Sequence, residues 1–470
     1  MERLGGLDTA FLGLEAPRQT GHVGSIVVLD PDGLGVPFDR AHLRALLAER
    51  VGRLSLFRKR LQMVPFGLDR PYWVDDPDFD LDDHVRASAL PAPGARQDLV
   101  DLVARLHERP LDMTQPLWET YLITGLEGGR CAVYMKVHHA MLDGLSGVEL
   151  LTALVDLEPG IMPGEPAVHE PSRRPSGLNL LGRAASSITE RPKDAKRLAS
   201  GLVRYAPALA INGASRVRRL VAKGSTGEAV TSPLRAPSTP FNGAISAQRR
   251  IGLTQLPLAD LKTIKNAFGV SVNDVVLAAS AAAVRQWLIA HDASVGKPLV
   301  TMIPVALPGD RTGAAGNSVT AMFTPLPVHL EDPVRRLTAA HAATVAAKSS
   351  GAAVPADIYE GGLAFAPPII MAPLMRNFFQ LGLFQQVRTC NLVVSNIPGP
   401  DVTLYLGGAV VEALYPVSII TDGLGLNITL QGLGENLNVG VLACRDVMPD
   451  VQELADAMRA EVEVLLNAAR

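Results

Sequence analysis

The spacing of apolar residues along this chain predicts which segments are helices and which are strands. Apolar residues three and four positions apart indicate a helix packed on one face, whereas alternation or short apolar runs indicate a strand. Helical spacing occurs at residues 40–53, 97–109, 147–157, 258–268, 272–291, 335–349 and 451–466. Strand patterns occur at residues 23–29, 132–137, 243–251, 299–305, 320–326, 390–396, 410–417, 425–431 and 437–443, the last three as hairpins, and another strand ends near residue 125. Helices and strands are mixed in both halves, so we predict a mixed α/β fold.

A proline-rich and strongly basic segment separates the two halves. Prolines cluster at residues 159–175, and residues 171–224 hold 12 Lys and Arg against 2 Asp and Glu. We therefore divide the chain into an N-terminal subdomain (1–157), a partly helical linker (158–240) and a C-terminal subdomain (241–470). The basic segment is either a solvated connection or a surface that docks on an anionic membrane or lipid droplet.

Composition narrows the classes of function. The 470 residues are 47% hydrophobic and 19% charged, and the net charge of −3 does not favour nucleic acid as a partner. The three cysteines lie far apart without a CxxC pair, which argues against a metal site and favours a reducing cytoplasm. The N-terminus shows no signal peptide, and the uncharged run 361–375 is interrupted by three prolines and shorter than the roughly 20 residues of a membrane span. We expect a cytoplasmic protein with at most peripheral membrane contact.

The strand predicted at residues 132–137 leads directly to the best candidate for chemistry. Alternation places His139 on the apolar side of this strand, with Val137 before it, and His138 on the opposite, more polar side. Partial desolvation holds a histidine near neutral charge, as a general base requires. Asp143 and Gly144 follow, where the strand gives way to a turn.

Two other polar groups stand where regular elements begin or end. Ser271 and Asp274 have the spacing of a capping box, which is a structural role for Asp274. Asn273 lies at the start of that helix, where free backbone N–H groups and a side-chain amide converge on developing negative charge. Asn396 ends an apolar strand just before a proline, either as a turn former or facing a cleft.

The stretch HHAMLDG at residues 138–144 resembles the HHxxxDG motif of the bacterial wax ester synthase/diacylglycerol acyltransferases, within the superfamily of CoA-dependent acyltransferases. Further landmarks of that family follow in the same order along nearly the whole chain, the linker excepted: Asp8, Phe11 and His22 near the start, then FDL (79–81), LD (111–112), PLWE (116–119), ND (273–274), SNIPGP (395–400), GLNIT (425–429) and PD (449–450). The resemblance implies two chloramphenicol-acetyltransferase-like subdomains, each a mixed sheet flanked by helices, with an active-site tunnel between them.

The resemblance also implies the reaction and its partners. Long-chain acyl-CoA would donate its acyl group to the hydroxyl of diacylglycerol, giving triacylglycerol, with fatty alcohol as the alternative acceptor and no cofactor or metal. His139 would act as general base, without a covalent acyl-enzyme. Asp143 would orient the loop or the imidazole, paired with an arginine, and Asn273 would stabilise the oxyanion unless Asn396 or a backbone N–H does so. The rival interpretations are a condensation-type or polyketide-associated acyltransferase and a catalytically silent lipid-binding protein.

Overall fold

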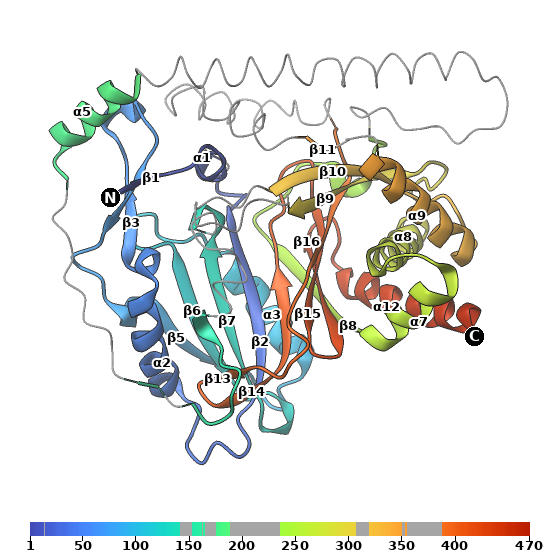
Figure 1. Ribbon diagram of the computed structural model, residues 1–470, viewed down its shortest axis with the longest axis horizontal. Coiled ribbons are helices and arrows are strands. Elements are labelled where there is room, and N and C mark those ends of the chain that lie inside the picture. The colour runs from blue at the N-terminus through green and yellow to red at the C-terminus, as the bar shows by residue number, and fades with distance from the viewer. Residues whose placement is uncertain are drawn as a thin grey trace.

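The computed structural model describes residues 1–13, 15–141, 153–161, 163–164, 175–188, 236–306, 319–349, 353–354 and 388–470. Two large sheets stand side by side in these residues, and most of the helices lie on their outer sides (Figure 1). The predicted helix at 147–157 lies largely outside them, and the apolar run 361–375 lies wholly outside them.

The first sheet is mixed and has six strands in the order β13-β14-β2-β7-β6-β5. The strands are β2 (His22–Asp30), β5 (Val85–Ala89), β6 (Trp118–Thr124), β7 (Cys131–His138), β13 (Tyr405–Leu406) and β14 (Ala409–Val417). Only β5 and β6 are parallel neighbours. The helices of this half are α1 (Gly6–Gly13), α2 (Arg40–Arg53) and α3 (Arg96–Glu108).

A small three-stranded sheet stands beside the six-stranded one, in the order β1-β4-β3. Its strands are β1 (Glu2–Arg3), β3 (Lys59–Gln62) and β4 (Tyr72–Asp75). The helix α5 (Gly177–Ile188) packs on it, at the upper left of Figure 1.

The second sheet is mixed and has seven strands in the order β11-β10-β9-β12-β15-β16-β8. They are β8 (Arg249–Pro257), β9 (Leu299–Ala306), β10 (Val319–Leu326), β11 (Ala353–Val354), β12 (Leu392–Ile397), β15 (Leu426–Leu433) and β16 (Asn436–Cys444). β12 runs parallel to both of its neighbours. Its outer side carries the helices α7 (Leu258–Phe268), α8 (Val272–Ala290), α9 (Pro333–Ser349) and α12 (Val451–Ala469) (Figure 1).

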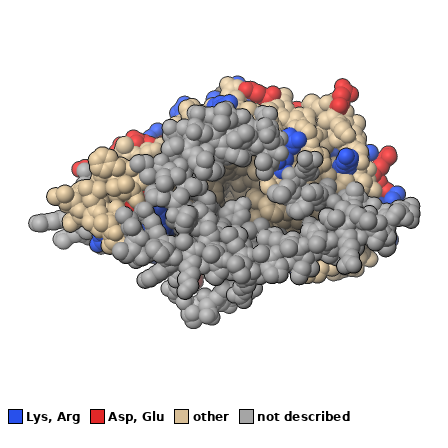
Figure 2. Space-filling model, turned by 90° about the horizontal axis from the view of Figure 1, so that it is seen from above, with Lys and Arg blue, Asp and Glu red and all other residues tan. Residues whose placement is uncertain are grey.

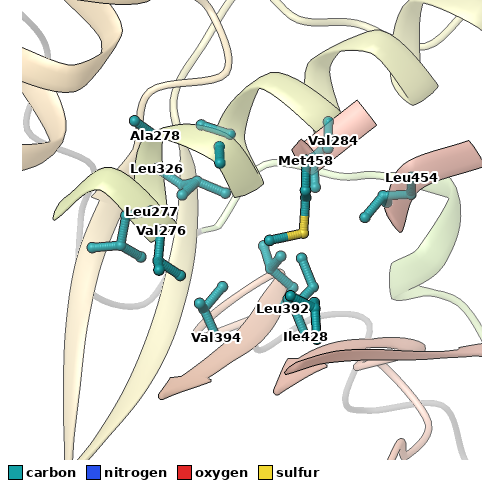
Figure 3. Packing of buried hydrophobic residues seen from close by; sticks show 14 of the residues in the cluster. Val276, Leu277, Ala278, Val284, Leu326, Leu392, Val394, Ile428, Leu454 and Met458 are labelled. Atoms are coloured by element: carbon teal, nitrogen blue, oxygen red, sulfur yellow. The ribbon is translucent and has the colours of Figure 1, made fainter. Parts of the chain in front are cut away.

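The alternation of side chains in β15 shows how this second sheet divides a dry side from a polar one. Leu426, Ile428 and Leu430 face the helices and belong to the largest apolar core, in which Val394 of β12 lies beneath Val276 of α8 (Figure 3). The intervening Asn427, Thr429 and Gln431 point to the opposite side, yet they too are buried. Buried polar side chains require partners; Asn427 Nδ2 donates to the Ile419 carbonyl over 3.1 Å, and Thr429 Oγ1 donates to Asn427 Oδ1 over 2.8 Å.

Two strands from the C-terminal part of the chain, β13 and β14, belong to the first sheet. β14 pairs antiparallel with β2, from Val410 opposite Asp30 to Val417 opposite Gly24. At β14 the backbones of the two sheets approach so closely that a Cβ on Gly440 of β16 would overlap the carbonyl oxygen of Pro416 in β14. The two halves are therefore joined by a strand exchange as well as by side-chain packing.

The described residues confirm most predicted elements and correct one. The helix predicted at 40–53 has those bounds, and Ser271 and Asp274 form the predicted capping box. The strand predicted at 243–251 was wrong in its start: β8 begins at Arg249, because the amides of Ile245 and Ser246 bind the Asp422 carboxylate and Cys444 Sγ instead of a strand. The strand predicted at 410–417 is confirmed as β14, but its hairpin partner is β13 and its other neighbour is β2, whereas the strands predicted at 425–431 and 437–443 form a hairpin as β15 and β16.

We predict that Gly440→Ala destabilises the protein, because the added methyl group forces β16 and β14 apart. The free energy of unfolding should fall by about 1–3 kcal/mol, the usual cost of overpacking, as measured by urea denaturation. Gly182→Ala is the matched control, since nothing lies within 4 Å of a Cβ built there. Equal stability of the two variants would contradict the close approach of the sheets.

Candidate active site

His139 lies one residue beyond the end of β7, in the short 3₁₀ turn His139–Met141. Its backbone N–H donates to the carbonyl of Gly21 over 2.8 Å, which continues the β2–β7 pairing past the pair His22–His138. The loop before β2 therefore fixes the position of the His139 backbone relative to the end of the sheet.

The predicted polar side of β7 is not exposed, because all eight residues of the strand are buried. Tyr134 lies within hydrogen-bonding distance of His107 Nδ1 (2.7 Å), and the ammonium of Lys136 donates to the carbonyls of Leu106 and Arg109 at the end of α3. A cation at a helix C-terminus satisfies carbonyls that have no partner within the helix. Burial lowers the pKa of Lys136, and the carboxylate of Glu119, 3.2 Å away, opposes that shift.

Both ring nitrogens of His138 form hydrogen bonds within the fold, which gives this residue a structural role. Nδ1 accepts a hydrogen bond from the Ala140 amide (3.1 Å), so Nε2 carries the proton and donates it to the Glu15 carboxylate (3.1 Å). Glu15 Oε1 also accepts from the Gly21 amide over 2.6 Å. The carboxylate thus holds both the strand carrying His138 and the loop carrying Gly21.

Gly21 has no room for a side chain at this junction. A Cβ there would lie 2.8 Å from His138 Nε2 and 3.1 Å from the Phe11 carbonyl oxygen. Only glycine lets the loop pass between α1 and β7 while its carbonyl binds His139.

The imidazole of His139 stacks on Phe11 of α1, with ring centroids 3.9 Å apart and planes inclined by 21°. Burial, with a smaller contribution from the positive charge of a protonated His138, lowers the pKa of His139 to about 4. The ring is therefore neutral near pH 7 and keeps one nitrogen free to accept a proton. These contacts fit the predicted general base.

The N-terminal segment contributes more to this site than the sequence indicated. Phe11 and His22 were noted as family landmarks, whereas Glu15 was missed, because a lone acid gives no signal of a partner 123 residues away. His22 is buried rather than solvated: its Nε2 lies 2.6 Å from the His107 carbonyl oxygen, and burial lowers its pKa to about 3.

Asp143 and Gly144 lie outside the described residues, and so does Ser146. The predicted partnership of Asp143 with an arginine therefore stays a prediction. Just beyond this gap, Asp156 is held by Arg50 of α2, with N–O distances of 2.7 and 2.8 Å.

Asp274 is a structural anchor at the start of α8. Besides the capping box with Ser271, its carboxylate accepts hydrogen bonds from Thr344 Oγ1 (2.6 Å) and His341 Nδ1 (2.8 Å) of α9. Burial favours the neutral acid, yet the hydrogen bonds from Thr344, His341 and Ser271 together lower the pKa of Asp274. The ionised carboxylate thereby fixes the N-terminus of α8, next to Asn273.

Asn273 and Asn396 belong to two elements, α8 and β12, that both pack into the C-terminal core. β12 runs from Leu392 to Val394 toward the end of α8 that carries Val276 (Figure 3). Asn273 precedes Val276 by three residues, and Asn396 follows Val394 by two. Asn396 Oδ1 is buried and has no hydrogen-bond partner among the described residues. Among the described residues, neither the Asn273 nor the Asn396 side chain forms a hydrogen bond with His139.

The surroundings of the site give little sign of other chemistry. Across the described ranges, no group of three or more His, Cys, Asp or Glu side chains could hold a metal ion. No single described helix is long and apolar enough to cross a membrane, and α7 and α8 pass that test only as a pair bent by 102°. A cavity of about 350 Å³ opens among α8, α9 and α12, remote from β7. Seen from above, the molecule is hollowed near its centre, and described residues form part of the floor (Figure 2).

Solved structures define the class of fold. The first condensation domain of the calcium-dependent antibiotic synthetase is 17% identical with a TM-score of 0.51, over 100% of this chain and 96% of its own, which shows a shared fold. The wax ester synthase/diacylglycerol acyltransferase from Marinobacter aquaeolei VT8 is more similar, at 28% identity and a TM-score of 0.70 over 99% of both chains. The predicted mixed α/β fold of this acyltransferase class is confirmed.

Sequence comparison identifies the family within that class. The family model of the wax ester synthase/diacylglycerol acyltransferase catalytic domain matches residues 4–276, and that of the WS/DGAT C-terminal domain matches residues 315–465. Two Mycobacterium tuberculosis proteins named as diacylglycerol O-acyltransferases are 33% and 35% identical, over 100% and 98% of this chain and 91% and 99% of their own lengths. The chain belongs to the wax ester synthase/diacylglycerol acyltransferase family.

We predict that His139 stays neutral far below the usual histidine pKa, because burial disfavours the imidazolium. In a pH titration by NMR of histidine-labelled protein, the His139 signal should shift with a midpoint near pH 4. The signal is assigned by its absence from the spectrum of His139→Ala. A midpoint near 6.5 would show that the ring is solvated and would remove the basis for its neutrality.

Proposed function

We propose that this protein transfers a long-chain acyl group from acyl-CoA to the hydroxyl of diacylglycerol, releasing triacylglycerol and CoA. The observation that carries the proposal is the neutral imidazole of His139, held against Phe11 at the end of β7. The names of the mycobacterial relatives support diacylglycerol as the acceptor.

His139 acts as general base in this proposal. Its free ring nitrogen takes the proton of the acceptor hydroxyl while the oxygen attacks the thioester carbonyl carbon. The tetrahedral intermediate then expels CoA as a thiolate, which receives the proton back from the imidazolium. The carbon–oxygen ester bond forms as the carbon–sulfur bond breaks, so no acyl-enzyme and no cofactor are needed.

Stabilisation of the negative oxygen falls to the asparagines of the C-terminal half. A donor in this role contributes about 2.7–4 kcal/mol. Asn273 is our first candidate, because the ionised Asp274 and its partners in α9 hold the first turn of α8 rigidly. Asn396, near the end of β12, is the second candidate. Asp143 orients the loop or the imidazole, and it takes no proton in the reaction.

Fatty alcohol is the alternative acceptor to diacylglycerol, because both present a hydroxyl on a long apolar body. The similar Marinobacter enzyme is named for both products, wax ester and triacylglycerol. Likeness to condensation domains extends to the fold alone and adds no carrier-bound substrate.

Because both lipid substrates partition into membranes or lipid droplets, we place the protein in the cytoplasm with peripheral contact with such a surface. Residues 171–224 hold 12 Lys and Arg but only 2 Asp and Glu, and this positive charge supports attraction of the protein to anionic lipid. The subdomain limits 1–157, 158–240 and 241–470 and the tunnel between the subdomains stay predictions.

Release of CoA thiol from palmitoyl-CoA, with dioleoylglycerol or hexadecanol offered in parallel, tests the reaction. We expect release that depends on acceptor, and a loss of about 10²–10⁴-fold in turnover in His139→Ala, because the base is gone. The acid limb of kcat/KM should follow the His139 pKa of about 4. Acceptor-independent release would point to a thioesterase, and no release from folded protein would point to lipid binding without catalysis.

Glu15 tests whether His139 must be positioned through its backbone. Glu15→Ala removes the acceptor shared by His138 and the Gly21 amide, and displacement of the imidazole should lower kcat by up to about 100-fold with little change in KM. Glu15→Gln keeps an acceptor oxygen of the same reach and should restore most of kcat. If the glutamine variant were as slow as the alanine variant, charge rather than position would be the role of Glu15.

A further inference from the structure

A cluster of large apolar side chains protrudes from the small sheet at one corner of the molecule. The turn between β3 and β4 exposes 58% of Met63, 78% of Phe66 and 40% of Leu68, and the start of α5 exposes 80% of Leu178. We call these four residues the apolar tip. Such exposure of neighbouring large side chains marks an interaction surface, because isolated ones need no explanation but a contiguous patch does.

The two chain segments of the apolar tip are held together from below. Gly177 lies against Pro65, since a Cβ built on this glycine would be 3.9 Å from Pro65 Cγ, so Leu178 and Phe66 flank one contact. Beneath it, Val64, Tyr72 and Val74 of the sheet region bury Leu180 and Ala184 of α5. The apolar tip is therefore a built feature on a small core of its own.

The backbone at Phe66 is strained in a way that favours presenting the ring to solvent. Phe66 has φ 60° and ψ 10°, a left-handed conformation that costs a bulky residue free energy and that glycine adopts freely. The ring gains no burial in return. A strained residue that stabilises nothing within the fold points to a function outside it.

We infer that the apolar tip inserts into the surface of an anionic lipid layer. Side chains that are 78% and 80% exposed have most of their surface in water, which suits insertion into a fluid interface better than the fitted core of a protein contact. The flanking sequence supplies the complementary charge: α5, with its exposed Arg183, lies within the basic segment 171–224.

The location of the apolar tip agrees with the proposed function, on which the choice of a lipid partner rests. α5 lies at the same end of the molecule as α1, whose Phe11 stacks on His139 (Figure 1). A lipid surface that receives the apolar tip would therefore lie at the end of the molecule that carries α1.

Flotation with lipid vesicles tests the inference without any need for turnover. Wild type is compared with Phe66→Asp combined with Leu178→Asp, on vesicles of phosphatidylcholine and of an equimolar mixture with phosphatidylglycerol. We expect wild type to prefer the anionic vesicles and the tip variant to bind at least about tenfold less, because two apolar side chains no longer leave water.

The matched control is Ile289→Asp combined with Val464→Asp. It makes the same change of charge at two exposed apolar residues away from the apolar tip, on α8 and α12, where the side chains are 51% and 46% exposed. It should bind as wild type does. Phe66→Gly provides a variant that cannot be dismissed as misfolded, because it removes the ring and also relieves the left-handed strain; it should melt no lower than wild type yet bind less.

Unchanged binding of the tip variants, an equal loss in the control, or no binding of wild type to either vesicle would overturn the inference. Equal binding of wild type to both vesicles would overturn the anionic preference. His139→Ala should float as wild type does, so failure of the proposed reaction and failure of lipid docking are observed separately.

Discussion

The burial of the polar side of β7 is the constraint on which the N-terminal half depends. A buried polar group without a partner costs about 1–3 kcal/mol, and this strand buries Tyr134, Lys136 and His138 together. Each binds a different part of the structure: His107 of α3, the carbonyls that end α3, and Glu15 beyond α1. Satisfying all three side chains at once holds α3 and the N-terminal segment against β7. These contacts therefore also fix the position of His139, which directly follows the strand.

The same arrangement explains how the half-buried His139 can be both desolvated and neutral, as the proposed general base requires. His139 is anchored through its backbone to Gly21, which leaves the ring nitrogens free of that duty. Phe11 covers one face of the ring and helps exclude water, and the resulting loss of solvation lowers the pKa of His139 to about 4. Positioning and protonation state thus follow from the same packing, and Glu15 supports both because it joins His138 to the Gly21 loop.

The C-terminal half is positioned by a different device. β14, with the short β13 beside it, pairs with β2 and so belongs to the first sheet, while β15 and β16 remain in the second. Where the two sheets meet, the backbone at Gly440 lies against Pro416, and the polar side chains of β15 turn away from the apolar core. Asn273 lies on α8 and Asn396 on β12, so the pairing of β14 with β2 ties the part of the chain that carries them to the N-terminal half.

Local signals along the chain were enough to predict the elements that depend only on neighbouring residues. Periodic apolar residues predicted the bounds of α2, and the Ser271–Asp274 spacing predicted the capping box of α8. Alternation predicted that His139 follows the end of β7. Each of these features depends on residues that are neighbours along the chain. Long-range packing is what buries the polar side of β7, brings Glu15 to His138, starts β8 at Arg249 and pairs β14 with β2. Those outcomes depend on partners distant in sequence, and which distant groups satisfy a buried donor or a strand edge is settled by packing the whole chain at once.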